Sequence, residues 1–319
     1  MSVHSAERAQ PHILDGVTVP LVTPLTADRV PDAKLVVPLL DSLKRSGIDT
    51  LMLLGTNGEG ATLDGPDAVR FATEAAQAWR DIRGAGAKVL IATFGAGTAH
   101  LMASARSMLA ARPDAIVVAP PHYFVHTERE LLAHFRATAD LGLPIIAYNI
   151  PRYSGNPITP ALLEQLFALD HIVGMKDSGG GEELIDLGIR LQNQSRRFGI
   201  SQGNEKLLGW ALLRGARGIT PGVGNLAPAL SSAIVAAANA GNVAEVERLQ
   251  TLLTGFTTIH TVRPGVPAMK AALSLLGLCT PTPGAPFEAY SADENGRLWA
   301  ILDARREGLA APLRPLGSA

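Results

Sequence analysis

Short apolar runs alternate along the chain with longer segments whose apolar residues recur at helical spacing. The runs are bounded by Gly, Pro or Asn, as strands usually are, and several, such as residues 51–54, show no alternation of polar and apolar side chains. Uninterrupted apolar strands are typical of parallel sheets covered on both faces. Eight such runs lie at residues 17–23, 50–56, 88–94, 115–119, 144–150, 172–177, 197–202 and 218–221. Eight strand–helix units predict a closed (β/α)8 barrel, the TIM barrel of the α/β class, and favour it over a doubly wound open sheet.

The pattern changes after residue 225, where Ala- and Leu-rich segments predict helices without intervening strands. We expect one helix over about residues 228–253, a second over 267–276 and a third over 292–306. The predicted organisation is a barrel domain at residues 13–227 followed by a C-terminal helical region, or annex, at residues 228–319. Residues 312–319 are expected to fray, as chain ends often do.

The charge balance and the first residues narrow the kinds of partner. The formal net charge is −1, and the sequence has no cluster of Lys or Arg that could follow a phosphate backbone or an anionic membrane surface. Residues 1–10 lack the apolar core of a signal peptide, and no run of ~18 apolar residues follows. We therefore expect a cytoplasmic protein without nucleic acid or membrane partners. Charged residues make up 18% of the chain, against ~25% in typical domains, which favours an oligomer.

Lys176 is the first candidate for chemistry, because it lies at the end of a predicted strand. Reactive groups in such a barrel collect at the carboxyl ends of the strands, and lysine is scarce here, with six residues against 22 arginines. An amine in a low-dielectric site loses its proton more easily, and the unprotonated amine can attack a ketone to form an iminium. From its residue type and position alone, a lysine that is solvated, or one that is paired with Asp177, is an equally good interpretation.

Two further strand ends carry polar groups that suit the same chemistry. Tyr148 ends the fifth predicted strand, beside the sixth, so its phenol could pass protons to and from a substrate held by Lys176. A tyrosine anchored for packing is the competing interpretation. Thr56 and Asn57 precede a Gly-Glu-Gly sequence, where backbone N–H groups can face a carboxylate. A turn selected for its geometry alone explains this composition almost as well.

Four motifs in this order resemble those of the pyruvate-dependent aldolase superfamily, which contains dihydrodipicolinate synthase, N-acetylneuraminate lyase and 4-hydroxy-2-oxoglutarate aldolase. They lie at residues 19–24 (VPLVTP), 55–59 (GTNGE), 148–151 (YNIP) and 174–178 (GMKDS). The resemblance covers nearly the whole chain. It implies a Schiff-base-forming lyase that acts on pyruvate or a longer 2-keto acid together with an aldehyde, without a cofactor or a metal.

The resemblance also implies roles for individual residues. The catalytic group comprises a Schiff-base lysine, a proton-transferring tyrosine and two further hydroxyls of a proton relay, namely Lys176, Tyr148, Thr56 and Tyr123. The substrate is expected to contact Thr56, Asn57, Thr220, Gly203 and Arg152. In tetrameric relatives the residue that matches Tyr123 reaches into the neighbouring active site, so a homotetramer built as a dimer of dimers is implied.

Two departures bear on the aldehyde. The synthase usually has two hydroxyl residues where this chain has Thr56 and Asn57, a pair closer to that of 4-hydroxy-2-oxoglutarate aldolase. The synthase also has an arginine where this chain has Tyr153, and here the arginine comes one residue earlier, as Arg152. Residues 171–180 resemble the hydroxyoxoglutarate aldolase, whereas residues 148–155 look more like neuraminate lyase. We expect an aldolase of the hydroxyoxoglutarate type, with the synthase and a 2-keto-3-deoxy sugar acid dehydratase as alternatives.

Three other classes of function remain open at this point. His122, His126 and His134 lie close in sequence and could serve a metal, although no carboxylate pair accompanies them and the single cysteine, Cys279, provides no zinc-ligand pair. Residues 222–225 (GVGN) follow the eighth predicted strand, where some barrels bind phosphate. A sensor that binds a keto acid without turning it over is the third possibility.

Overall fold

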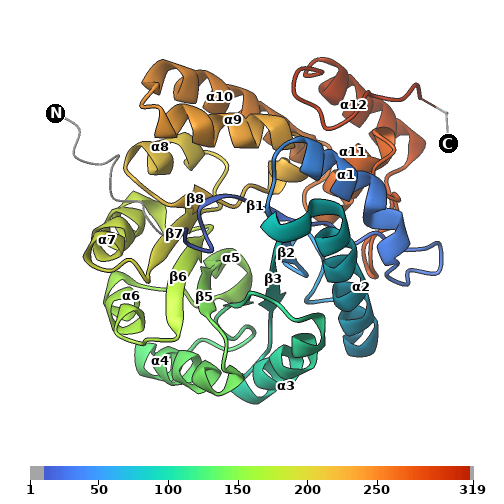
Figure 1. Ribbon diagram of the computed structural model, residues 1–319. Coiled ribbons are helices and arrows are strands. Elements are labelled where there is room, and N and C mark those ends of the chain that lie inside the picture. Colours follow the sequence, from blue (N-terminus) through green and yellow to red (C-terminus); the bar gives the residue numbers. More distant parts are fainter. Residues whose placement is uncertain (1–10, 317–319) are drawn as a thin grey trace.

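The computed structural model describes residues 11–316, which form a closed barrel of eight parallel strands in sequence order. Figure 1 looks along the barrel, with the strands at the centre and helices around them. The strands are β1 (Gly16–Pro20), β2 (Thr50–Leu53), β3 (Lys88–Thr93), β4 (Ala115–Val118), β5 (Ile145–Asn149), β6 (Ile172–Asp177), β7 (Gly199–Gln202) and β8 (Gly218–Ile219). The prediction of a (β/α)8 barrel is confirmed. The doubly wound sheet is excluded because β1 pairs with β8.

The α-helices of residues 11–316 surround this barrel. They are α1 (Val37–Arg45), α2 (Gly65–Arg83), α3 (Thr98–Met108), α4 (Glu128–Ala137), α5 (Pro151–Ser154), α6 (Pro160–Phe167), α7 (Gly181–Gln194), α8 (Leu208–Leu213), α9 (Pro228–Asn239), α10 (Val243–Phe256), α11 (Val266–Leu275) and α12 (Ala292–Asp303). The C-terminal helices lie together at the top of Figure 1. Because α9 packs against β1 and α8, it covers the barrel as an eighth outer helix, and the predicted domain boundary at residue 227 stays a prediction.

Two apolar layers explain why these segments fold as strands. One layer packs the outward side chains of the strands against the helices. The other fills the barrel interior; it includes Leu14, Met52, Leu90, Val117 and Ile146. At the amino ends of the strands His12 closes the barrel, with its Nε2 at 3.0 Å from both Val173 O and Arg197 O. Burial lowers the pKa of His12, so the ring is neutral at pH 7 and its Nε2–H can donate.

A one-residue slip in the pairing of β5 with β6 determines which side chains face the interior. Opposite the start of β5, the strand β6 contains Val173 as an extra residue. Side chains alternate along a strand, so an extra residue reverses the facing of those that follow. Beyond the slip Tyr148 pairs with Lys176; without it, Tyr148 would be level with Met175, which packs in the outer layer. This bulge therefore places both functional side chains at one level.

The C-terminal region differs from the prediction in two ways. The helix expected over residues 228–253 is interrupted, because Gly241 adopts a left-handed φ of 68° and the Asn242 side chain caps the new helix α10 by accepting from Glu245 N. The tail is not frayed at residues 312–316, since Arg314 N donates to Leu275 O at 2.9 Å and Trp299 Nε1 donates to Arg314 O at 2.8 Å. Residues 317–319 lie outside the described part.

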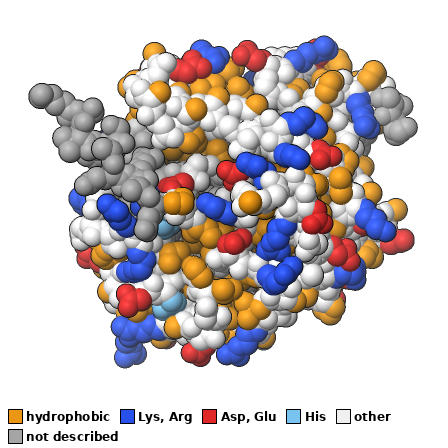
Figure 2. Space-filling model, in the orientation of Figure 1, with side chains coloured by type: hydrophobic (Ala, Val, Ile, Leu, Met, Phe, Trp, Pro, Cys, Tyr) orange, Lys and Arg blue, Asp and Glu red, His pale blue; other side chains and the backbone are white. Residues whose placement is uncertain are grey.

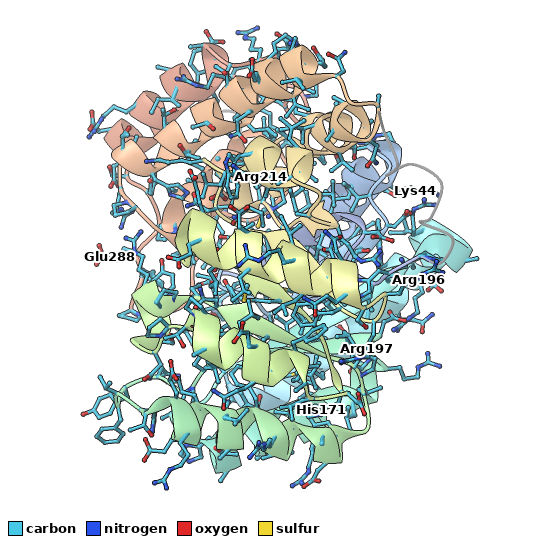
Figure 3. All side chains as sticks on the ribbon, turned by 90° about the vertical axis from the view of Figure 1, so that its left-hand side faces the viewer. Lys44, His171, Arg196, Arg197, Arg214 and Glu288 are labelled. Carbon is cyan, nitrogen blue, oxygen red and sulfur yellow. The ribbon has the colours of Figure 1, made fainter. Side chains whose placement is uncertain are left out.

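The surface offers no obvious single-sign patch on the face shown in Figure 2, where acidic and basic side chains are interspersed over the same elements. No helix among residues 11–316 is long and apolar enough to cross a membrane. Figure 3 shows the barrel from the side. His171 and Arg197, which precede β6 and β7, lie at one end of it, and Glu288 lies at the other, where the strands end. The site described next lies at this carboxyl end.

Candidate active site

Lys176 and Tyr148 lie in contact where β5 and β6 end. Lys176 is 4% exposed and Tyr148 is 2% exposed, and the amine of Lys176 lies 3.8 Å from the centre of the Tyr148 ring. Lys176 Nζ also donates a hydrogen bond of 2.7 Å to Ser178 Oγ. No carboxylate forms a direct ion pair with this lysine among the described residues. The interpretation of Lys176 as a solvated residue is therefore wrong.

Thr56 links the turn after β2 to this pair. Its hydroxyl and that of Tyr148 share a hydrogen bond of 3.2 Å, in which either oxygen can donate. The ring of Phe94 lies 6.3 Å from the Tyr148 ring and covers it from β3. A hydrogen bond thus joins the turn to the hydroxyl of the tyrosine whose ring contacts the amine. This is the arrangement that proton transfer to a bound substrate requires.

Gly203 and a pair of hydroxyls surround the lysine from β7 and β8. A β-carbon at Gly203 would lie 3.0 Å from Lys176 Nζ and 2.6 Å from Ser178 Oγ, so the absence of a side chain leaves space beside the amine. Ser201, which pairs with Lys176 across β6 and β7, shares a hydrogen bond of 2.7 Å with Thr220 Oγ1. The structure thus brings Gly203 and Thr220 into the neighbourhood of the lysine.

A cavity of about 510 Å³ lies at this end of the barrel; Thr56 lines it, whereas Lys176 and Tyr148 are not among its lining residues. Thr56 and Asn57 line it on one side, and both Arg152 and Tyr153 line it on another, despite the one-residue displacement of the arginine. Its remaining walls include Phe94, Ile150, Glu205, His260 and Phe287. His260 comes from the annex, so the C-terminal region contributes directly to the cavity.

The turn after β2 is strained. Leu54 and Glu59, on either side of Thr56, have left-handed φ values of 56° and 57°, which costs about 1–2 kcal/mol for each non-glycine residue. A β-carbon at Gly60 would lie 1.9 Å from Leu54 O, and one at Gly58 would lie 2.8 Å from Leu21 O. The two glycines are therefore required by close backbone approach. Strain of this kind persists only where the surroundings enforce it.

Tyr123 lies outside this cluster. Its side chain is 84% exposed, its φ is 84°, and its ring packs edge-on against Phe124 with centroids 4.8 Å apart. The expectation that Tyr123 completes the relay is therefore not met within one chain. A role in the site of a neighbouring subunit stays a prediction.

The alternative metal and phosphate sites find little support in the geometry. His134 is buried between Thr98 Oγ1 at 3.0 Å and Ala119 O at 3.3 Å, whereas His126 lies near Glu130. Within residues 11–316 no three His, Cys, Asp or Glu side chains are grouped so that they could hold a metal. In the 222–225 segment, Gly222 N already donates to Glu205 Oε1 at 2.8 Å. A carboxylate there disfavours a phosphate.

Three site residues were missed by sequence reasoning. Ser178 follows the lysine within a quoted motif and could have been found from its spacing, because residues i and i+2 face the same side of a strand. Glu205 lies in a loop, and His260 comes from a segment between two annex helices, so neither carries a local signal. Burial lowers the pKa of His260, and the nearby Glu205 partly opposes this shift. His260 is therefore neutral at pH 7, and it can donate or accept a hydrogen bond.

The fold and this site define a pyruvate-dependent lyase of the class I aldolase type. The chain belongs to the dihydrodipicolinate synthetase family, whose sequence model matches residues 13–305. It is 32% identical over 295 residues to the 4-hydroxy-tetrahydrodipicolinate synthase of Corynebacterium diphtheriae, covering 91% of this chain and 92% of the relative. It is 29% identical over 282 residues to that of Alkalilimnicola ehrlichii, covering 88% and 94%.

Solved structures agree with this assignment. YagE, a prophage protein of E. coli K12 that was crystallised in complex with pyruvate, has a TM-score of 0.85 and 27% identity, covering 92% of this chain and 98% of YagE. A monomeric dihydrodipicolinate synthase variant has a TM-score of 0.84 at 21% identity, covering 92% and 97%, which shows the shared fold. The family resemblance is confirmed, whereas the closer likeness to 4-hydroxy-2-oxoglutarate aldolase stays a prediction.

Proposed function

We propose that the protein is a Schiff-base lyase in which Lys176 Nζ attacks the ketone of pyruvate. One observation carries this proposal. The amine is buried at the carboxyl end of the barrel against Tyr148, whose hydroxyl is bonded to Thr56. An amine at this position can add to a ketone, and a phenol within reach can supply and remove the protons that the reaction needs.

The proposed reaction begins with formation of an imine between Lys176 and pyruvate. Lys176 Nζ adds to C2 of pyruvate, the carbinolamine takes a proton from Tyr148 and loses water, and an iminium remains. Tyr148, now a phenolate, takes a C3 proton and leaves an enamine. The enamine C3 then forms a bond to the carbonyl carbon of the aldehyde, while the aldehyde oxygen takes that proton from Tyr148. Water then hydrolyses the product iminium and frees the amine. Cleavage is the same sequence in reverse. Tyr148 exchanges its protons through Thr56.

The aldehyde is proposed to carry a carboxylate that pairs with Arg152. Arg152 lines the cavity and is exposed, with its guanidinium 5.7 Å from the Tyr153 ring centre, so its N–H donors can meet a ligand. The relatives named above are synthases, and they favour a synthase-type condensation over the hydroxyoxoglutarate aldolase reaction. A 2-keto-3-deoxy sugar acid would place hydroxyls against Glu205 and His260, and it ranks third.

A homotetramer is proposed on the basis of an exposed apolar segment. Tyr123, Phe124 and Val125 are 84%, 62% and 86% exposed, and adjacent apolar side chains of this kind usually mark an interface. In this assembly Tyr123 would enter the neighbouring site. Family membership does not fix the assembly, because the fold also occurs in a monomeric synthase variant. The cytoplasmic location stays a prediction.

Borohydride trapping tests the proposed function. The protein is incubated with pyruvate and sodium borohydride, and intact-mass spectrometry is followed by peptide mapping. We expect one reduced pyruvyl adduct on Lys176, none in Lys176→Ala, and an unchanged adduct in Lys44→Ala, which changes an exposed lysine on α1. Screening glyoxylate, an amino-acid semialdehyde and glyceraldehyde with pyruvate then identifies the aldehyde class. Absence of any adduct would contradict the Schiff-base mechanism and would favour a keto-acid sensor or a metal-dependent enzyme.

A further inference from the structure

A buried ion pair joins the strained turn after β2 to the annex. Glu59 belongs to the turn and Lys270 to α11, and their side chains are in direct contact with an exposed fraction of 0% for each. Glu59 also lines the cavity. The two residues are far apart in sequence, so this contact forms only when the annex has folded against the barrel.

The partners of both charges lie in one segment that follows α11. Gly284 N donates to Glu59 Oε2 at 2.6 Å, and Lys270 Nζ donates to Thr282 O at 2.9 Å. A buried charge pair is tolerated only when its remaining hydrogen-bonding capacity is satisfied, and here the backbone of the annex satisfies it. Burial lowers the pKa of Lys270, and the carboxylate of Glu59 opposes this shift. The ion pair and its backbone partners, Thr282 and Gly284, thus hold the turn against the annex.

The restraint on Glu59 reaches Thr56 through the backbone of the turn. Glu59 N donates to Thr56 O at 3.2 Å, and Glu59 is held in the left-handed conformation described above. A turn in such a conformation relaxes when its restraint is removed. Relaxation would move Thr56, whose hydroxyl shares the hydrogen bond of 3.2 Å with Tyr148.

We infer that Glu59 and Lys270 are positioning residues, which hold the strained turn so that the Thr56 hydroxyl stays within reach of Tyr148. The annex thereby sets the geometry of the proton relay, although neither charge touches the reacting atoms. This inference rests on the proposed function, because it assigns a task to residues that act through the relay.

The test compares variants that break the pair with one that breaks a different ion pair, beside the other end of β2. Glu59→Gln is nearly isosteric and retains an acceptor for Gly284, and Lys270→Met removes the other charge. Arg83→Met is the control, because Arg83 pairs with Asp49 at the opposite end of β2. We expect each site variant to lower kcat about 10–100-fold, the range for a misplaced catalytic contact. The KM for pyruvate should change little, and the Lys176 adduct should still form.

A double-mutant cycle separates positioning from a general loss of stability. If Glu59 acts through Thr56, Glu59→Gln should cost little further kcat in a Thr56→Val background, because coupled residues are not additive. The double variant Glu59→Gln/Lys270→Met leaves no unpaired buried charge, so we expect it to recover melting temperature without recovering kcat. It also replaces Lys270→Met if that variant does not fold.

Several results would overturn the inference. A normal kcat in Glu59→Gln would do so, as would full additivity with Thr56→Val. A purely structural role would give a different result. In that case kcat would fall only in parallel with melting temperature, and it would fall as far in Arg83→Met as in the variants of Glu59 and Lys270. These results differ from a failure of the proposed function, which would appear as a missing pyruvyl adduct in the unaltered protein.

Discussion

Replacing Tyr148 by Phe removes one hydroxyl and leaves the ring that packs against Phe94 and Lys176. We expect turnover to fall about 10²–10⁴-fold, the usual contribution of a positioned acid–base group. The fold and the melting temperature should change little, because the lost hydrogen bond is a single one to Thr56. Steady-state kinetics with the aldehyde found by screening measures this effect. Tyr290→Phe, which removes a hydroxyl that donates to Arg263 O and does not line the cavity, is the matched control and should keep normal turnover.

Gly203 is predicted to be essential for a different reason, since it provides space for the substrate. The β-carbon of Gly203→Ala would lie 3.0 Å from Lys176 Nζ and 2.9 Å from Asp177 O, where a bound pyruvate needs room beside the amine. We expect the yield of pyruvyl adduct at limiting pyruvate to fall about tenfold or more, as for other small displacements of reacting groups.

The control for this substitution is Gly296→Ala in α12. A β-carbon there meets no atom within 4 Å, and alanine stabilises a helix interior by about 0.5–1 kcal/mol relative to glycine. The adduct yield of Gly296→Ala should therefore be normal. An unchanged yield in Gly203→Ala would remove the steric argument.

A site residue could be predicted from the sequence only where a local pattern or a motif marks its position. Lys176, Tyr148 and Thr56 each end a strand or begin the loop after it, so a local pattern and a motif identify them together. Their contact is a different matter, because it depends on Val173 as an extra residue in β6, and nothing in the sequence marks that slip. The annex residue His260 reaches the cavity through tertiary packing alone, and therefore no motif predicts it.

At the scale of elements, apolar periodicity predicted the strands well and the annex helices less well. A buried parallel strand is a short apolar run with few competing interpretations. The segment 228–253 keeps helical periodicity across Gly241 and Asn242, so its break depends on one left-handed residue and one cap. The prediction that residues 312–316 fray was wrong because Trp299 binds the backbone of the tail. Composition does not reveal such a contact.

One buried histidine links three elements and makes stability depend on pH. His134 on α4 is bonded to Thr98 at the start of α3 and to Ala119 after β4, and burial lowers its pKa to about 4. Its pKa in the unfolded chain is about 6.5. Between these values the unfolded state binds the proton and the folded state does not, so stability falls as the pH decreases from 6.5 towards 4.

The size of this effect can be measured by urea unfolding at pH 7 and pH 5. We expect His134 to account for about 1–2 kcal/mol of the loss between the two values. The pKa values of His12 and His260 are lowered by burial as well and act in the same direction, whereas the raised pKa of Asp177 acts in the opposite one. His134→Gln should flatten the pH dependence, and His100→Gln, which changes an exposed side chain on α3, should not. Equal slopes in both variants would contradict the assignment.

The whole molecule is predicted to assemble through the segment after β4. Tyr123, Phe124 and Val125 leave their apolar surface to solvent in one chain, although most apolar side chains of their size are buried elsewhere in the described part. In a two-fold interface both subunits use the same surface patch, so this segment of one subunit would pack against the corresponding patch of the other. A glutamate at position 125 would bring an unpaired charge into that contact, where desolvation is costly.

We therefore expect Val125→Glu to shift the protein from tetramer to dimer or monomer in sedimentation velocity at micromolar concentration. Because Tyr123 would no longer reach a neighbouring relay, turnover should fall although the Lys176 adduct still forms. Val243→Glu, on the exposed side of α10, is the control and should keep both assembly and turnover. A monomeric unaltered protein with full turnover would show that the relay of Thr56 and Tyr148 is sufficient without Tyr123. Loss of assembly without loss of turnover would separate the interface from the chemistry.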